Sequence, residues 1–146
     1  MTTLITSQAP DAKPVGLSAI LTTSWDSLIE VPDYQIPVET FGGGIKVVPG
    51  VGEIISPLLI CNTTGSTVTI SLRIYRDTTS SYFMLANNMP IPANDIIAIP
   101  LNGQFIATND ILEAKASSNN ALNVTISYTV GQAEQDDVDG ETTVAP

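Results

Sequence analysis

The stretch from Thr67 to Arg76, Thr-Val-Thr-Ile-Ser-Leu-Arg-Ile-Tyr-Arg, decides the fold class of this chain. Every second side chain in it is a branched apolar one: Val68, Ile70, Leu72 and Ile74. Because successive side chains of a strand point to opposite faces, this alternation predicts a β-strand with one buried and one exposed face. Such a strand is typical of an antiparallel sheet that packs on one side only.

The same alternation recurs from Leu122 to Val130, and shorter strand signals lie between the two. They cover residues 81–86, 95–99 and 111–116. Residues 53–62 are more continuously apolar, and Pro57 within them predicts a break or bulge. Turn-forming residues at 63–66, 77–80 and 118–120 predict hairpins between these strands. About eight strands at this spacing predict an all-β, antiparallel β-sandwich of the jelly-roll or immunoglobulin-like type.

Composition divides the chain into three regions. Residues 1–16 lack periodicity and predict an extended N-terminal arm, and residues 17–131 hold the sandwich domain. Within that domain, residues 33–53 contain a triple glycine and predict an irregular insertion loop. Residues 132–146 carry a cluster of acids and little to bury, which predicts an acidic C-terminal tail.

Charge argues against nucleic-acid and membrane partners. The net charge is −10, and the five basic residues are scattered along the chain, whereas binding to phosphate backbones requires clustered Lys and Arg. No apolar run approaches the ~20 residues that span a bilayer. The N-terminus has no basic segment followed by a long apolar run, so we expect synthesis in a cytoplasm. Only 14% of residues are charged, which favours a surface suited to protein contacts.

The chain lacks the histidine that Ser-His-Asp and Cys-His enzymes require and the ligands that zinc sites usually use. There is no histidine, and the single Cys61 lies in an apolar run, where a buried structural side chain is expected. A carboxylate pair formed from Asp95, Asp110 and Glu113 has no local support, because Asn94-Asp95 and Asn109-Asp110 are typical of turns that lead into strands. We therefore expect no catalysis, no cofactor and no metal ion.

Several segments resemble a known family. The segment Ile60–Ile70 is similar to a hairpin of small β-sandwich virion proteins of tailed bacteriophages, including marine and cyanobacterial ones. Further segments resemble other blocks of that family: Ala86–Asp95, Leu101–Gly103, Thr108–Ser117 and Val124–Val130. The resemblance covers about residues 17–131. It implies a virion structural protein of the tail, the neck or the head, and it brings no catalytic residues.

The function expected from this resemblance is self-assembly and docking onto neighbouring virion proteins, with a homo-oligomer in the virion. Candidate anchors in the arm are Leu4, Ile5, Val15 and Leu17, and candidate anchors in the insertion are Ile36, Val38 and Phe41. Two alternatives remain open. One is a carbohydrate-binding module of a tail fibre with Trp25 as the glycan contact, and the other is a calcium-dependent adhesion domain that uses Asp77, Asp95 and Asp110.

Overall fold

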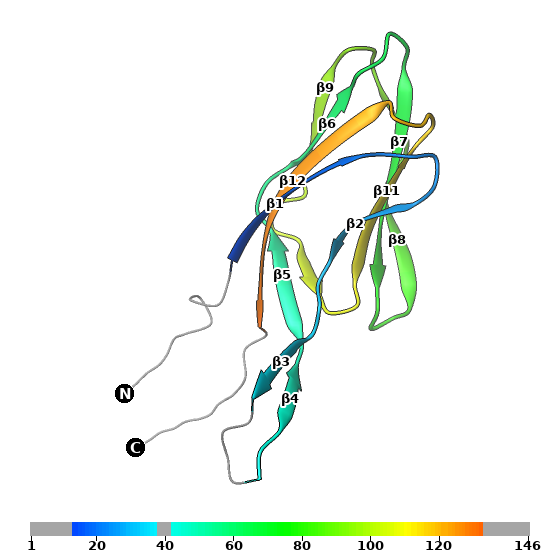
Figure 1. Cartoon of the computed structure of the whole chain (residues 1–146). Coiled ribbons are helices and arrows are strands. Elements are labelled where there is room, and N and C mark those ends of the chain that lie inside the picture. The colour runs from blue at the N-terminus through cyan, green and yellow to red at the C-terminus, as the bar shows by residue number, and fades with distance from the viewer. Residues whose placement is uncertain (1–12, 38–41, 133–146) are drawn as a thin grey trace.

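The computed structural model describes residues 13–37 and 42–132, which form two packed antiparallel sheets and a separate hairpin (Figure 1). The six-stranded sheet contains β1 (Lys13–Ile20), β5 (Gly50–Ile54), β6 (Leu58–Asn62), β9 (Ile96–Ile99), β10 (Phe105–Ala107) and β12 (Leu122–Gln132). The four-stranded sheet has the order β2 (Asp26–Glu30), β11 (Ile111–Ala116), β7 (Val68–Arg76) and β8 (Ser81–Ile91). The hairpin pairs β3 (Tyr34–Pro37) with β4 (Ile45–Val48).

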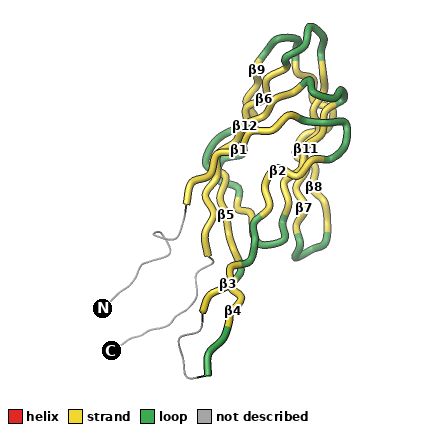
Figure 2. Tube along the Cα trace, viewed as in Figure 1, coloured by secondary structure: helices red, strands yellow, loops and turns green. Residues whose placement is uncertain are grey.

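The predicted fold class is confirmed: the described residues form an all-β, antiparallel sandwich, and Figure 2 shows strands and loops with no helix among them. The predicted strand count of about eight is too low, because the described residues form twelve strands. Most of the strands that the sequence did not predict have three to five residues, whereas β1 has eight, half of which were assigned to the N-terminal arm. The shortest, β10, has three residues, which is too few for a sequence pattern to show which side chains are buried. Its place in the sheet is set by its pairing with β5.

The long strand β12 is the central strand of the six-stranded sheet and pairs with three others. On one side it pairs with β1 along its length, from Lys13 opposite Val130 to Ile20 opposite Asn123. On its other side β6 and β5 lie end to end, and the chain between them bends at Ser56 and Pro57. The backbone NH of Ser127 donates to Ser56 Oγ over 2.8 Å and bridges the bend. The predicted break at Pro57 is thus confirmed.

The core lies between the two sheets and is made almost entirely of Leu, Ile, Val and Ala. The fully buried large side chains come from both layers: Leu21, Ile29, Ile54, Leu58, Ile60, Ile70, Leu72, Ile91, Ile106, Leu112, Leu122 and Ile126. Burying such a side chain is favourable by about 1.5–3 kcal/mol. The alternating residues of β7 and β12 supply much of this core, as their sequence pattern predicts.

The connections correct the hairpin prediction. Residues 77–80 do join a hairpin, since β7 and β8 pair directly. However, residues 63–66 carry the chain from β6 in one sheet to β7 in the other, and residues 118–120 likewise join β11 to β12 across the sandwich. The same turn residues serve both connections, because they reverse the chain without fixing which sheet the next strand enters.

Three predicted boundaries also change. Strand β1 begins at Lys13, so residues 13–16 belong to the sheet and not to the arm. The predicted insertion loop at residues 33–53 contains the β3–β4 hairpin, which extends from one end of the sandwich, and most of β5 (Figure 1). Gln132, assigned to the tail, is the last residue of β12. In each case backbone pairing orders a segment whose side chains gave no strand signal.

Candidate interaction surfaces

Four of the predicted anchor residues lie outside the described residues: Leu4, Ile5, Val38 and Phe41. The backbone of Ile36 is in β3, opposite Lys46 of β4. Val15 and Leu17 are in β1, opposite Tyr128 and Ile126, and Leu17 packs against the core of its own chain. Leu17 thus has a role inside the sandwich, and a contact of either residue with a neighbour stays a prediction.

A cluster of cationic and aromatic side chains crosses the outer face of the four-stranded sheet. The guanidinium carbon of Arg73 lies 4.0 Å from the ring centre of Trp25 and 3.8 Å from that of Tyr82. Arg73 Nε also donates to Glu113 Oε1 over 2.7 Å. Lys115 Nζ lies 4.8 Å from the ring of Trp25. The cluster thus links the segment before β2 to β8, across β11 and β7.

This geometry bears on the glycan alternative for Trp25. A sugar ring stacks on the open face of an aromatic side chain, but two cations already lie against this indole. Each cation–π contact contributes about 0.5–1 kcal/mol at an exposed site. The arrangement gives Trp25 an intramolecular role, and a glycan contact at this residue stays a prediction.

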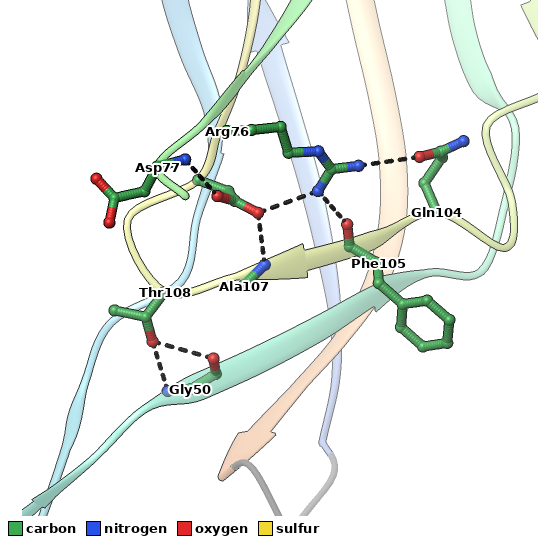
Figure 3. A network of polar contacts seen from close by, with 8 residues as sticks. Gly50, Arg76, Asp77, Gln104, Phe105, Ala107 and Thr108 are labelled. Carbon is green, nitrogen blue, oxygen red and sulfur yellow. Dashed lines mark hydrogen bonds and ion pairs between the residues drawn. The ribbon is translucent and has the colours of Figure 1, made fainter. Parts of the chain in front are cut away.

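A second polar network surrounds the buried carboxylate of Asp110 (Figure 3). Its oxygens accept hydrogen bonds from Arg76 Nη1 at 3.0 Å, from the backbone NH of Asp77 at 2.9 Å and from that of Ala107 at 3.0 Å. Burial alone raises the pKa of Asp110, but these hydrogen bonds and the charge of Arg76 outweigh it and lower the pKa below 3.8. Asp110 therefore fastens the end of β7 to the β10–β11 turn.

Neighbouring residues in Figure 3 add further hydrogen bonds to this network. Arg76 also donates to the carbonyl oxygen of Phe105 over 2.6 Å and to Gln104 Oε1 over 3.2 Å. The Thr108 hydroxyl accepts a hydrogen bond from the backbone NH of Gly50 and donates to its carbonyl oxygen. A Cβ at Gly50 would overlap the carbonyl oxygen of Pro32, so this position requires glycine. The network holds the start of β5 against its neighbours.

The predicted turns before strands are confirmed at both Asn-Asp pairs. Asn94 and Asn109 adopt positive φ values of 56° and 70°, and the following aspartates precede β9 and β11. The carboxylate of Asp110 is occupied by its hydrogen bonds, and Asp95 accepts one from the backbone NH of Ile96. Among residues 13–37 and 42–132, no three Asp, Glu, Cys or His side chains lie close enough to hold a metal ion.

Two of the segments that carry the family resemblance meet at one end of the sandwich. The buried Asn62 side chain donates to the carbonyl oxygens of Ser66 and Ile91, and its Oδ1 accepts from the NH and the hydroxyl of Thr64. The backbone NH of Asn94 donates to the carbonyl oxygen of Thr64 over 3.0 Å. These motif residues therefore stabilise the connections that carry the chain between the sheets.

Apolar side chains are exposed at one edge of the four-stranded sheet. We call this the β8 edge: Tyr82, Phe83, Met84 and Leu85, which are 53%, 49%, 50% and 39% exposed. Tyr82 and Met84 lie opposite Tyr75 and Arg73 on the outer face, whereas Phe83 lies opposite the core residue Ile74, so the exposed apolar groups flank this edge strand on both faces. Exposed apolar side chains gathered in one place tend to mark interaction sites. The sequence predicts a strand at residues 81–86 but gives no sign of an exposed surface. The missed signal is the unbroken apolar run, which departs from the alternation of the other strands.

Two further apolar areas are exposed elsewhere. A shallow hollow of about 480 Å³ on the outer face of the six-stranded sheet is lined by Ile20, Leu59, Cys61 and Ile96, with polar neighbours. On the β3–β4 hairpin, Ile45 and Val47 are more than half exposed. The outer-face residues of the hollow come from four strands, so no local pattern in the sequence brings them together.

Comparisons with known proteins add no functional information. No protein-family model matches the chain, and no curated protein matches it. A solved structure described as "Structure of Eiger TNF from S. frugiperda" is similar over 88% of this chain and 99% of that chain, with 11% identity and a TM-score of 0.33. A likeness this weak carries no argument. In the part of the chain that the structure describes, no helix is long and apolar enough to cross a membrane.

Proposed function

We propose that this protein is a structural, non-enzymatic component of a tailed-phage virion, made in the host cytoplasm. It acts by self-assembly and by docking onto neighbouring virion subunits, as a tail or neck accessory protein or as a capsid decoration. The family resemblance of residues 17–131 supports the virion assignment. The partners are other virion proteins and further copies of this chain.

The observation that supports an assembly role most directly is where the exposed apolar groups lie. They gather on a sheet edge, on a sheet face and on a projecting hairpin: the β8 edge, the hollow around Leu59, and Ile45 with Val47. Covering apolar patches of this kind with a protein partner removes them from water, which lowers the free energy of the complex. None of the exposed apolar residues named here is charged, so these surfaces can be covered without burying an ionised side chain of their own.

The polar groups support a role without catalysis. The chain contains no histidine. The acids that the structure brings into networks are already partnered, Glu113 by Arg73 and Asp110 by Arg76 and backbone NH groups. These pairs link strands to each other, as a rigid structural unit requires.

Native mass spectrometry of the full-length chain tests self-assembly. We expect discrete oligomers whose population rises with protein concentration. A chain that stays monomeric throughout the micromolar range would contradict the self-assembly part of the proposal.

A second experiment tests the virion assignment. Tailed particles purified from cells that produce this chain should contain it in a fixed ratio to the major capsid protein. Antibodies against the chain should label one position on the particle. Recovery of the chain only in the soluble lysate, with none on particles, would contradict a virion role.

A further inference from the structure

From the β8 edge we infer that β8 pairs antiparallel with β8 of a second copy of this chain across a two-fold axis, so that two four-stranded sheets become one continuous sheet. The inference deepens the proposed self-assembly and rests on it. It names the partner and the strand that the contact uses.

The first argument is that one side of β8 is free. In the four-stranded sheet β8 is the last strand, paired with β7 from Arg76 opposite Ser81 to Val68 opposite Ile91. No strand among the described residues pairs with its other side. An edge strand presents unpaired NH and C=O groups there, which another strand of matching register can satisfy.

The second argument is that only half of β8 is protected. The register with β7 shifts at Leu85 and again around Asn87 and Asn88, and Asn88 has a φ of 51°. These bulges, with Pro90, disfavour strand addition to the second half. Residues 81–84 keep a regular register, and β8 contains no charged side chain. Its first half thus lacks the bulges, prolines and charged side chains that normally prevent an edge strand from pairing with another chain.

The other described edges differ from β8. Strand β2 has five residues and carries Asp26 and Glu30 at its ends. Strands β9 and β10 have four and three residues. Strand β1 is eight residues long but begins with Lys13 and Pro14. Length, neutrality and an apolar run of large side chains coincide only at β8.

A second copy is the partner because the β8 edge is self-complementary. Antiparallel pairing of identical strands places each free NH opposite a C=O, and the two-fold axis repeats every contact. Two chains of net charge −10 repel one another, so the contact must lie where no acids face each other. The β8 edge meets this condition, since residues 81–91 contain no acid.

The area of the edge sets the strength of the contact. An aromatic side chain buries about 150–250 Å² in full, so four large apolar side chains at about half exposure offer roughly 300–400 Å² per copy. The total of about 700 Å² is below the ~1,200–2,000 Å² of stable complexes. We therefore expect a weak, concentration-dependent dimer, which repetition in a larger assembly strengthens.

The variant Met84→Glu tests the contact while preserving the fold. Met84 lies opposite Arg73 of β7, so a carboxylate there has a cation beside it in the monomer. In the dimer it places like charges near the axis. We expect the dimer dissociation constant from analytical ultracentrifugation to rise by at least about tenfold. The control Ile45→Glu alters an apolar residue on the β3–β4 hairpin that is 63% exposed, against 50% for Met84, and should leave this constant unchanged.

Disulfide formation tests the register. In a Cys61→Ser background, single cysteines replace Tyr82, Phe83, Met84 and Leu85 in turn. A residue on the two-fold axis faces its own copy within the ~4.4–6.8 Å between Cα atoms that a disulfide needs, whereas its neighbours in sequence do not. We expect one position to form disulfide dimers much faster than the others.

The outcomes separate this inference from the proposed function. If the wild type forms oligomers that Met84→Glu leaves intact, and no cysteine position is preferred, the β8 inference is overturned while self-assembly stands. If the wild type is monomeric throughout, the two-fold β8 contact and self-assembly are both overturned, and the particle-purification experiment separately tests docking onto other virion proteins. If the chain is monomeric and β8 instead pairs with a strand of a different protein, the two-fold contact is overturned and docking remains.

Discussion

The two edges of the four-stranded sheet, β2 and β8, belong to one layer but present opposite surfaces. On β2 the apolar side chains Leu28 and Ile29 are buried, and the charged residues Asp26 and Glu30 mark both ends. On β8 the large apolar side chains from Tyr82 to Leu85 are all at least 39% exposed, and no residue is charged.

The difference teaches that burial and pairing are separate requirements of an edge strand. Strand β2 meets both within the chain, because its apolar residues lie in the core and its charges discourage further pairing. The first half of β8 is paired on one side only, by β7, and although Tyr82 contacts Arg73, its large apolar side chains stay at least 39% exposed, so a partner strand can add both pairing and burial. Substitutions at the two edges should therefore change the free energy of unfolding of the isolated chain by different amounts.

The largest effect is expected from removing the buried anchor of β2. Ile29→Ala leaves a cavity in the core and should lower the free energy of unfolding by about 2–5 kcal/mol. Phe83→Ala on β8 removes a half-exposed ring and should cost only about 1 kcal/mol in the monomer. Urea denaturation at low protein concentration measures both. Equal losses would mean that the two edges contribute alike to the fold.

An intermediate effect is expected at Asp110, which accepts hydrogen bonds from Arg76 and Asp77 at the turn end of the β7–β8 hairpin. Asp110→Asn removes a buried charge-assisted contact with Arg76 and leaves one backbone NH without an acceptor. We expect a loss of about 2–3 kcal/mol in the free energy of unfolding at pH 7. The matched control, Asp95→Asn, changes an exposed aspartate before β9 and should fall within about 0.5 kcal/mol of wild type.

The same residue predicts a pH dependence. The pKa of Asp110 is lower in the folded chain than in the unfolded one, so its stabilising contribution is present above the unfolded value of about 3.9. It is lost as the pH falls through the lower, folded value. We expect the wild type to lose more stability below pH ~4 than Asp110→Asn does. Parallel stability curves for the two proteins would exclude this role.

The smallest effect is expected from the cluster that joins the two edges. A double-mutant cycle of Trp25→Ala and Arg73→Ala, followed by circular dichroism during urea unfolding, should give a coupling of about 0.5–1 kcal/mol. The control cycle pairs Trp25→Ala with Arg76→Ala, whose guanidinium belongs to the Asp110 network. It should give no coupling, and similar values in both cycles would remove the argument for a specific contact.

Sequence reasoning located strands better than surfaces. The segment 111–116 is a strand at its predicted bounds, and the break at Pro57 is where the sequence placed it. Among the candidate site residues, Trp25 lies in a polar cluster, but with cations over its ring instead of an open face. The β8 edge was missed, because an apolar run in a strand is equally typical of a buried core strand.

The sequence by itself determined the long alternating strands β7 and β12 and several of the turns, because alternation and turn-forming residues act over a few neighbouring positions. Only the tertiary structure decided which strands pair. The turn at 63–66 crosses between sheets, whereas the turn at 77–80 makes a hairpin, although both are short and polar. Pairing depends on how distant side chains fill one common core. That packing buries one edge of the sheet and leaves the other exposed.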